Sequence, residues 1–234
     1  MDSVRTRWVG YLLMLGGVFG VVLAPPLVAI KYMTGWAVIP EPFWVPAARA
    51  WLGETFAGAR PAALWMAFGT GYSIALVLML GGLVALAPTF QGRTRVQRIG
   101  YWLVVSGLAL VLPGDAIHSW TWHQNGLTIP TPGSNPIANT AYATHMMGMN
   151  LVMVGSLVLG VTALRRRTLA RWVAAMFILI FPAALVASIT VLPTTPSGAL
   201  WLFAALMGFS GFFVARGRSL LPPNQAMKLA AGPG

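Results

Sequence analysis

Acidic and histidine side chains are rare in this sequence, and four of the seven lie between residues 115 and 145. The chain has four acidic residues and three histidines. Asp115, His118 and His123 fall within nine residues of one another, and His145 follows in the next apolar stretch. Carboxylate and imidazole groups can bind metal ions, hold polar ligands or transfer protons. These four residues are therefore the first candidates for a functional site.

The sequence around these candidates is strongly apolar. Of the 234 residues, 57% are hydrophobic and only 8% are charged, whereas soluble domains carry about 25% charged residues. A chain with so few charges cannot cover a globular surface exposed to water. Several continuous apolar stretches reach the length of about 20 residues that crosses a bilayer as a helix. The composition predicts an all-α, polytopic membrane protein.

The apolar stretches predict a bundle of six transmembrane helices in one domain, residues 1–218. The first stretch is longer than the apolar core of a signal peptide and no clear cleavage site follows it, so we interpret it as a helix. The final segment, residues 219–234, predicts a disordered cytoplasmic tail. The expected spans cover about residues 8–30, 62–86, 99–119, 140–164, 172–192 and 199–215.

Basic residues give an orientation to these six spans. An even number of spans places both termini on one side, and cytoplasmic segments of membrane proteins are enriched in Lys and Arg. The segments outside the membrane on the other side carry only Lys31, Arg49 and Arg60. The sequence therefore predicts an inner (plasma) membrane protein with both termini in the cytoplasm, and the net charge of +11 reflects orientation rather than nucleic-acid binding. The predicted cytoplasmic segments carry Arg5, Arg7, Arg93, Arg95, Arg98, Arg165, Arg166, Arg167, Arg171, Arg216, Arg218 and Lys228.

Two outer segments are long enough to have structure of their own. Apolar residues in the first segment, residues 31–61, recur at helical spacing and predict a short amphipathic helix on the outer membrane surface. The second, residues 120–139, is rich in Pro, Gly and Asn and predicts an irregular loop. The apolar stripe of the amphipathic helix consists of Trp44, Val45, Ala48, Trp51, Leu52 and Phe56.

The spans place Asp115 and His145 at similar depth. With a rise of about 1.5 Å per residue, Asp115 lies about 24 Å along the third span, or about 6 Å from the outer edge of the apolar layer. His145 enters from the outside and lies about 7 Å below the same edge. His118 shares the face of Asp115, and His123 is expected at the membrane surface. The two spans therefore predict a polar site near their outer, periplasmic ends, covered by the amphipathic helix.

Two interpretations of this site need no bound metal. A structural cluster would pair Asp115 with a histidine or with Lys31, since ionisable groups inside membranes find partners. A pocket for a small ligand would use Pro113-Gly114, which is expected to break or kink the helix and expose backbone groups. Asn150 and Thr70 would extend such a polar path toward the middle of the membrane. The first functional hypothesis is a membrane protein that is not an enzyme and that binds a small ligand, passes one, or assembles with other subunits.

A metal- or haem-binding redox subunit is the alternative. His145, Met149 and Met153 share one helical stripe, and imidazole with thioether ligands suits copper. A haem held between His118 and His145 is a variant of the same hypothesis. Cysteine is absent, which excludes disulfides, thiolate metal sites and cysteine nucleophiles.

Small residues at four-residue spacing provide surfaces for close helix packing. Gly16 and Gly20 form one such pair, and Ser156 and Gly160 form another. Small residues let helices approach closely, either within one chain or between subunits. The expected partners are therefore the lipid bilayer and, through these faces, other subunits of a homo- or hetero-oligomer.

Overall fold

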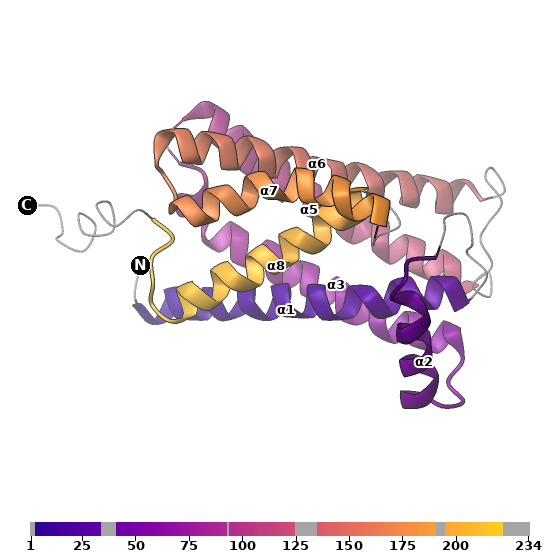
Figure 1. The fold of residues 1–234 in the computed structure, drawn as a ribbon. Coiled ribbons are helices and arrows are strands. Elements are labelled where there is room, and N and C mark those ends of the chain that lie inside the picture. The colour runs from indigo at the N-terminus through magenta and orange to yellow at the C-terminus, as the bar shows by residue number, and fades with distance from the viewer. Residues whose placement is uncertain (1–2, 34–40, 93, 125–134, 191–194, 222–234) are drawn as a thin grey trace, which may run out of the picture.

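Helices make up nearly all of the described chain, and no strand occurs among its described residues (Figure 1). The computed structural model describes residues 3–33, 41–92, 94–124, 135–190 and 195–221. Side chains are described at these positions except at 3–5, 118–119, 122–124, 187–190 and 195–198. The helices are α1 (Ser3–Met33), α2 (Val45–Thr55), α3 (Pro61–Ala85), α4 (Ala87–Phe90), α5 (Arg95–Gln124), α6 (Pro136–Arg166), α7 (Arg171–Thr190) and α8 (Thr195–Ala215).

Four of these helices are long and apolar enough to cross a membrane. They comprise Thr6–Met33, Pro61–Ala85, Arg95–Ile117 and Pro136–Arg166. The described parts of α7 and α8 form shorter apolar helices, Arg171–Val186 and Ala199–Ala215. The all-helical prediction is confirmed, and each of the six expected ranges overlaps one helix. That α7 and α8 also cross the membrane, which would give six crossings in place of four, remains a prediction.

The chain also forms the short helix expected before the second span. Val45 and Leu52 of α2 are fully buried, whereas Trp51 on the same predicted stripe is 47% exposed. An ion pair of 2.7 Å between Arg49 and Glu41 joins α2 to the segment that precedes it. α2 contacts α1 at the end of the bundle opposite to the start of α1 and the end of α8 (Figure 1).

α5 and α6 pack through a row of glycines that recurs every seven residues. A Cβ atom at Gly107 would lie 2.6 Å from the carbonyl oxygen of Gly148, and a Cβ atom at Gly148 would lie 2.6 Å from that of Gly107. At such a distance only hydrogen is accommodated between the two backbones. We call this contact the glycine seam; it also includes Gly100, Gly114 and Gly155.

The small residues predicted to mediate packing are used within the chain. A Cβ atom at Gly16 would meet the carbonyl oxygen of Ala75 in α3 at 2.8 Å. One at Gly160 would meet the carbonyl oxygen of Ala174 in α7, also at 2.8 Å. These faces bring the helices of one bundle together, so an oligomer contact through them would compete with the fold itself.

Pro113 does not interrupt α5. The helix continues through this residue and extends to Gln124, beyond the expected end at residue 119. Of the two outcomes expected at Pro113-Gly114, a break or a kink, the break does not occur. Proline removes one N–H donor, here the one that would reach the carbonyl of Ala109, and the remaining bonds can hold the helix together.

A tryptophan of α8 compensates for a proline in α1. Pro25 has no N–H to donate to the carbonyl of Val21, four residues earlier in the helix. The indole Nε1 of Trp201 donates a hydrogen bond to this carbonyl oxygen at 3.1 Å. Since an unsatisfied carbonyl is costly in an apolar environment, this bond both stabilises α1 and attaches α8 to it.

Replacing Trp201 with phenylalanine is expected to lower the free energy of unfolding by about 1 kcal/mol, because it removes this hydrogen bond and keeps an aromatic ring. In a Pro25→Ala background the backbone N–H at position 25 can donate a hydrogen bond to the Val21 carbonyl. Trp201→Phe should therefore lower the free energy of unfolding by less in that background. Denaturation of the four purified proteins in detergent, followed by circular dichroism, measures both costs. Equal costs in the two backgrounds would show that Trp201 acts through packing alone.

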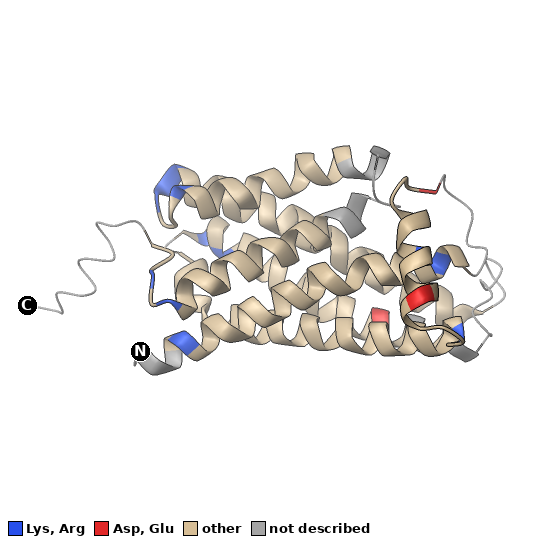
Figure 2. Cartoon of the chain, turned by 60° about the horizontal axis from the view of Figure 1, so that its bottom comes forward, with Lys and Arg blue, Asp and Glu red and all other residues tan. Residues whose placement is uncertain are grey.

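Charged residues divide between the two ends of the bundle (Figure 2). Most described arginines lie at the end where α5 begins and α8 finishes, whereas the three described acidic residues, Glu41, Glu54 and Asp115, lie toward the other end. The segments predicted from sequence to share the cytoplasmic side thus meet at one end of the fold.

Candidate functional site

Among the described acidic residues of the bundle, Asp115 is the one whose side chain is buried. It lies on α5 with 9% of its surface exposed. The hydroxyl Oγ of Ser73, on α3, donates a hydrogen bond to its Oδ2 at 3.2 Å. A carboxylate placed between apolar helices needs such donors, because water does not solvate it there. This bond ties α5 to α3.

Lys31 supplies the positive charge that faces Asp115. It stands in the last turn of α1 and interacts electrostatically with the Asp115 carboxylate. Its Nζ atom also lies 5.3 Å from the centre of the Trp65 ring, on α3, which is a cation–π distance. The lysine is therefore held between a carboxylate and an aromatic face. Lys31 was one of the partners expected for Asp115, and the two residues lie close enough to interact.

His145 enters the same region from α6. A Cβ atom at Gly114 would lie 2.7 Å from the backbone nitrogen of His145, so the residue beside Asp115 touches the residue that carries the imidazole. The imidazole interacts with the backbone carbonyl of Val111 and lies close enough to Lys31 for electrostatic interaction. Its Nδ1 atom is buried and has no hydrogen-bond partner among the described residues.

These residues form one group, which we call the polar cluster: Lys31, Tyr72, Ser73, Asp115 and His145. Tyr72 is 8% exposed and lies close enough to Asp115 for an electrostatic interaction. Four helices, α1, α3, α5 and α6, contribute to the cluster. An apolar bundle thus contains a carboxylate, an ammonium group, an imidazole and two hydroxyls near one another.

Tyr72 and Ser73 were missed in the sequence analysis, which selected Thr70 from the same stretch. The polar run Thr70 to Ser73 was a signal that α3 contributes to the site. Its rotation about its own axis decides which of these residues faces Asp115. Thr70 is exposed, and so is Asn150, whose Nδ2 donates to the carbonyl of Met146 on its own helix at 2.8 Å.

The remaining candidates fall into two groups. Met149 is buried, with 2% exposure, one turn after His145 on α6. The backbones of His118 and His123 belong to α5, but their side chains lie outside the described residues. The structure therefore joins Asp115, His145 and Lys31, and places Met149 next to them along α6.

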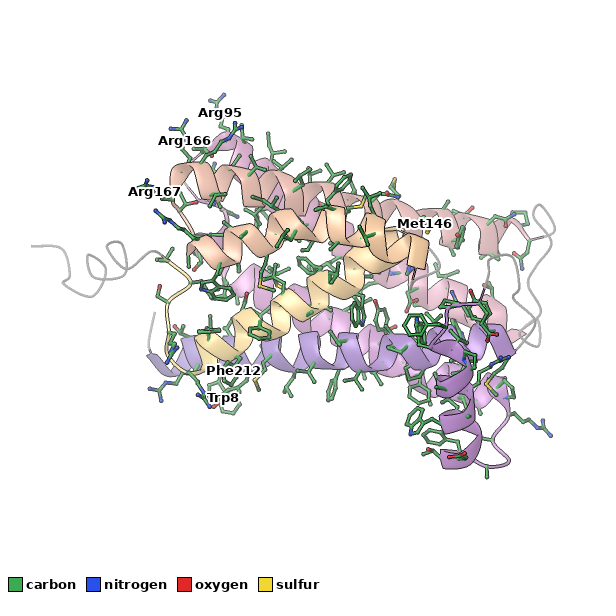
Figure 3. All side chains as sticks on the ribbon, in the orientation of Figure 1. Trp8, Arg95, Met146, Arg166, Arg167 and Phe212 are labelled. Carbon is green, nitrogen blue, oxygen red and sulfur yellow. The ribbon has the colours of Figure 1, made fainter. Side chains whose placement is uncertain are left out.

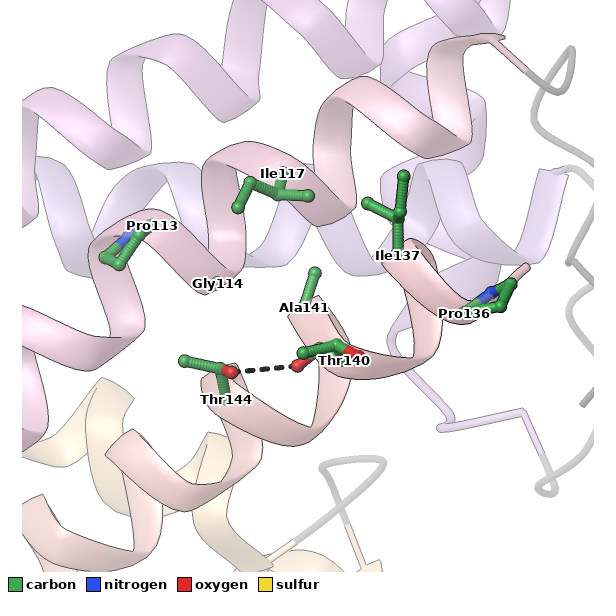
Figure 4. Close-up of a pocket in the computed structure, with 8 residues that line it drawn as sticks. All are labelled: Pro113, Gly114, Ile117, Pro136, Ile137, Thr140, Ala141 and Thr144. Atoms are coloured by element: carbon green, nitrogen blue, oxygen red, sulfur yellow. Dashed lines mark hydrogen bonds between the residues drawn. The ribbon is translucent and has the colours of Figure 1, made fainter. Parts of the chain in front are cut away.

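A hollow of about 310 Å³ opens between α5 and α6 beside the polar cluster (Figure 4). Gly114 forms part of its wall, and the hydroxyls of Thr140 and Thr144 lie on the α6 side. The Thr144 hydroxyl donates to the Thr140 carbonyl at 2.8 Å. The other lining residues are Pro113, Ile117, Pro136, Ile137 and Ala141.

The described donors fit a metal ion poorly. No group of three His, Asp or Glu side chains that could hold one occurs among the described residues. Asp115 and His145 both lie near the Lys31 ammonium group, which would repel a cation placed between them. The arrangement favours a neutral or anionic group at this position.

Comparison with known proteins adds no family to this description. The chain matches no protein-family model, no curated protein and no solved structure.

Proposed function

We propose that the protein is a multi-pass inner-membrane protein that binds a small polar ligand in the polar cluster without transforming it chemically. The main support for this proposal is the Nδ1 atom of His145, which is buried and has no hydrogen-bond partner among the described residues. Leaving a buried polar atom unsatisfied costs about 1–3 kcal/mol. A ligand that hydrogen-bonds to this nitrogen would remove that cost, which supplies binding free energy at the site.

Helix length and charge support the membrane assignment. Four helices can cross a bilayer by length and composition, and α7 and α8 would complete six crossings. The arginine-rich end would lie in the cytoplasm by the positive-inside rule. This orientation places the polar cluster and the hollow at the outer side, where a ligand from the periplasm could reach them.

The partners of Asp115 support binding rather than catalysis. Its carboxylate accepts a hydrogen bond from Ser73 and faces Lys31. A carboxylate that accepts a hydrogen bond from a hydroxyl and faces an ammonium group can hold these neighbours in position beside a ligand. Lys31 and His145 would then recognise the ligand, and the positive charge of Lys31 favours a ligand with a neutral or negative polar group.

Ser73→Cys tests whether the polar cluster is open to the outer solution. The chain has no cysteine, so one thiol can be introduced without removing others. A thiol at position 73 should react with a charged, membrane-impermeant methanethiosulfonate reagent added to intact cells. Reaction is expected because a ligand pocket must admit small polar molecules. Modification is measured by the mass of the purified protein.

Three further cysteine variants complete this experiment. Arg60→Cys should react from outside and Arg166→Cys should not, which checks the orientation separately from the pocket. Ser156→Cys introduces a thiol at a fully buried position of α6 and should stay unmodified. An unreactive thiol at position 73, together with a reactive one at position 60, would show that the cluster is closed and structural.

A further inference from the structure

A second hollow lies along the first three turns of α5, away from the polar cluster. It measures about 390 Å³ and is lined by Arg95, Arg98, Ile99, Trp102, Leu103 and Ser106. Most of these residues are three or four positions apart, so they share one face of the helix. We call this hollow the α5 groove. Its first turn is basic and its next two turns are mainly apolar.

The centre of the α5 groove, at Ile99 and Trp102, faces away from the rest of the bundle. Ile99 is 56% exposed and Trp102 is 49% exposed. The opposite side of α5 packs on α6, since a Cβ atom at Gly100 would lie 2.7 Å from the backbone nitrogen of Leu159. In a membrane, the exposed side of this helix contacts lipid.

The positive charge of the groove is not compensated by nearby acids. All described acidic residues, Glu41, Glu54 and Asp115, lie toward the other end of the bundle (Figure 2). The end of α6 brings more arginines to the same end as Arg95 (Figure 3). Guanidinium groups bind phosphate oxygens through paired hydrogen bonds.

We propose that the α5 groove binds one anionic phospholipid. Arg95 and Arg98 bind the phosphate group, and the Trp102 ring lies at the level of the ester bonds, where tryptophan is common in membrane proteins. An acyl chain follows Ile99 and Leu103 toward the middle of the bilayer. A zwitterionic lipid is disfavoured, because the arginines repel its cationic headgroup. The site is independent of the polar cluster and of any ligand there.

Quenching of tryptophan fluorescence by brominated lipids tests this proposal. The full chain is reconstituted in phosphatidylcholine vesicles that contain a small, equal share of brominated phosphatidylglycerol or brominated phosphatidylcholine. The anionic lipid should quench more than the zwitterionic one at the same mole fraction. Trp102→Phe should remove this excess, because Trp102 is the tryptophan that lines the α5 groove. An unchanged excess in this variant would overturn the proposal.

Charge variants identify the headgroup contact. Each of Arg95→Gln and Arg98→Gln should weaken the preference for the anionic lipid about fivefold, from the effect of one arginine near a charged membrane surface. The control is Arg216→Gln with Arg218→Gln, which removes two arginines near the rings of Phe212 and Phe213 at the end of α8. An equal loss in this control would mean that only the net charge matters, and would overturn the proposal.

Soluble glycerol 3-phosphate distinguishes a lipid site from a phosphate site. The groove offers more apolar than polar surface, so the headgroup alone should not displace the brominated lipid at millimolar concentration. Displacement would overturn the lipid assignment in favour of a soluble phosphate compound. Circular dichroism of each variant confirms folding, and Trp102→Phe keeps the test decisive should an arginine variant fail to fold.

Discussion

Replacing Gly107 with leucine is expected to prevent the chain from accumulating as a folded protein. The Cβ atom alone would lie 2.6 Å from the carbonyl oxygen of Gly148 and 2.8 Å from the backbone nitrogen of Val152. Overpacking among side chains costs about 1–3 kcal/mol, and here the obstacle is backbone, which cannot move aside by changing a rotamer. A whole domain is stable by only about 5–15 kcal/mol. Separation of α5 from α6 would also displace Gly114 from His145.

Gly81 provides a control position, at which an added side chain meets no neighbouring atom. It lies inside α3, and nothing stands within 4 Å of the position that its Cβ atom would occupy. Gly81→Ala should therefore stabilise the protein by about 0.5–1 kcal/mol, because alanine favours a helix more than glycine does. Yield of monodisperse protein after detergent extraction and size-exclusion chromatography measures both changes. Normal yield of Gly107→Leu would mean that the glycine seam is not a tight contact.

Removing either charge of the Lys31–Asp115 pair should destabilise the fold strongly. Lys31→Met leaves a carboxylate that accepts a hydrogen bond from Ser73 but faces no positive charge from Lys31, and Asp115→Asn leaves an ammonium group beside Trp65. An uncompensated charge in the interior costs about 3–5 kcal/mol. The double variant has neither charge, so its stability should return to within about 1 kcal/mol of the original protein. Denaturation curves in detergent for the four proteins give the coupling free energy.

The cost of removing an exposed ion pair provides a comparison for the cost of removing a charge at Lys31 or Asp115. Arg49 and Glu41 are joined at 2.7 Å with side-chain exposures of 38% and 33%, and removing such a pair should cost less than about 1 kcal/mol. A similarly small cost for Lys31→Met and Asp115→Asn would show that these charges remain solvated. The double variant also separates structure from function. It should fold, yet a ligand that depends on Lys31 should no longer bind.

The helices themselves could be predicted because their signals are local. Continuous apolar runs of membrane-spanning length predicted the ranges of α1, α3, α5, α6, α7 and α8 to within a few residues at most ends. The effect of a proline inside a helix was predicted less well. Pro113 was expected to break or kink α5, and the break does not occur, because one missing donor does not end a helix that packs along its length on α6.

The sequence by itself determined that the chain is apolar and helical, that most arginines gather at one end of the bundle, and that Asp115 and His145 lie at a similar depth along their helices. Each depends on composition or on the fixed rise of a helix, which can be counted along the chain. Only the tertiary structure decided that Ser73 rather than Thr70 meets Asp115, and that Asn150 faces outward. Helix rotation is set by contacts between distant segments, such as the glycine seam, and side chains one residue apart point about 100° away from each other around the helix axis.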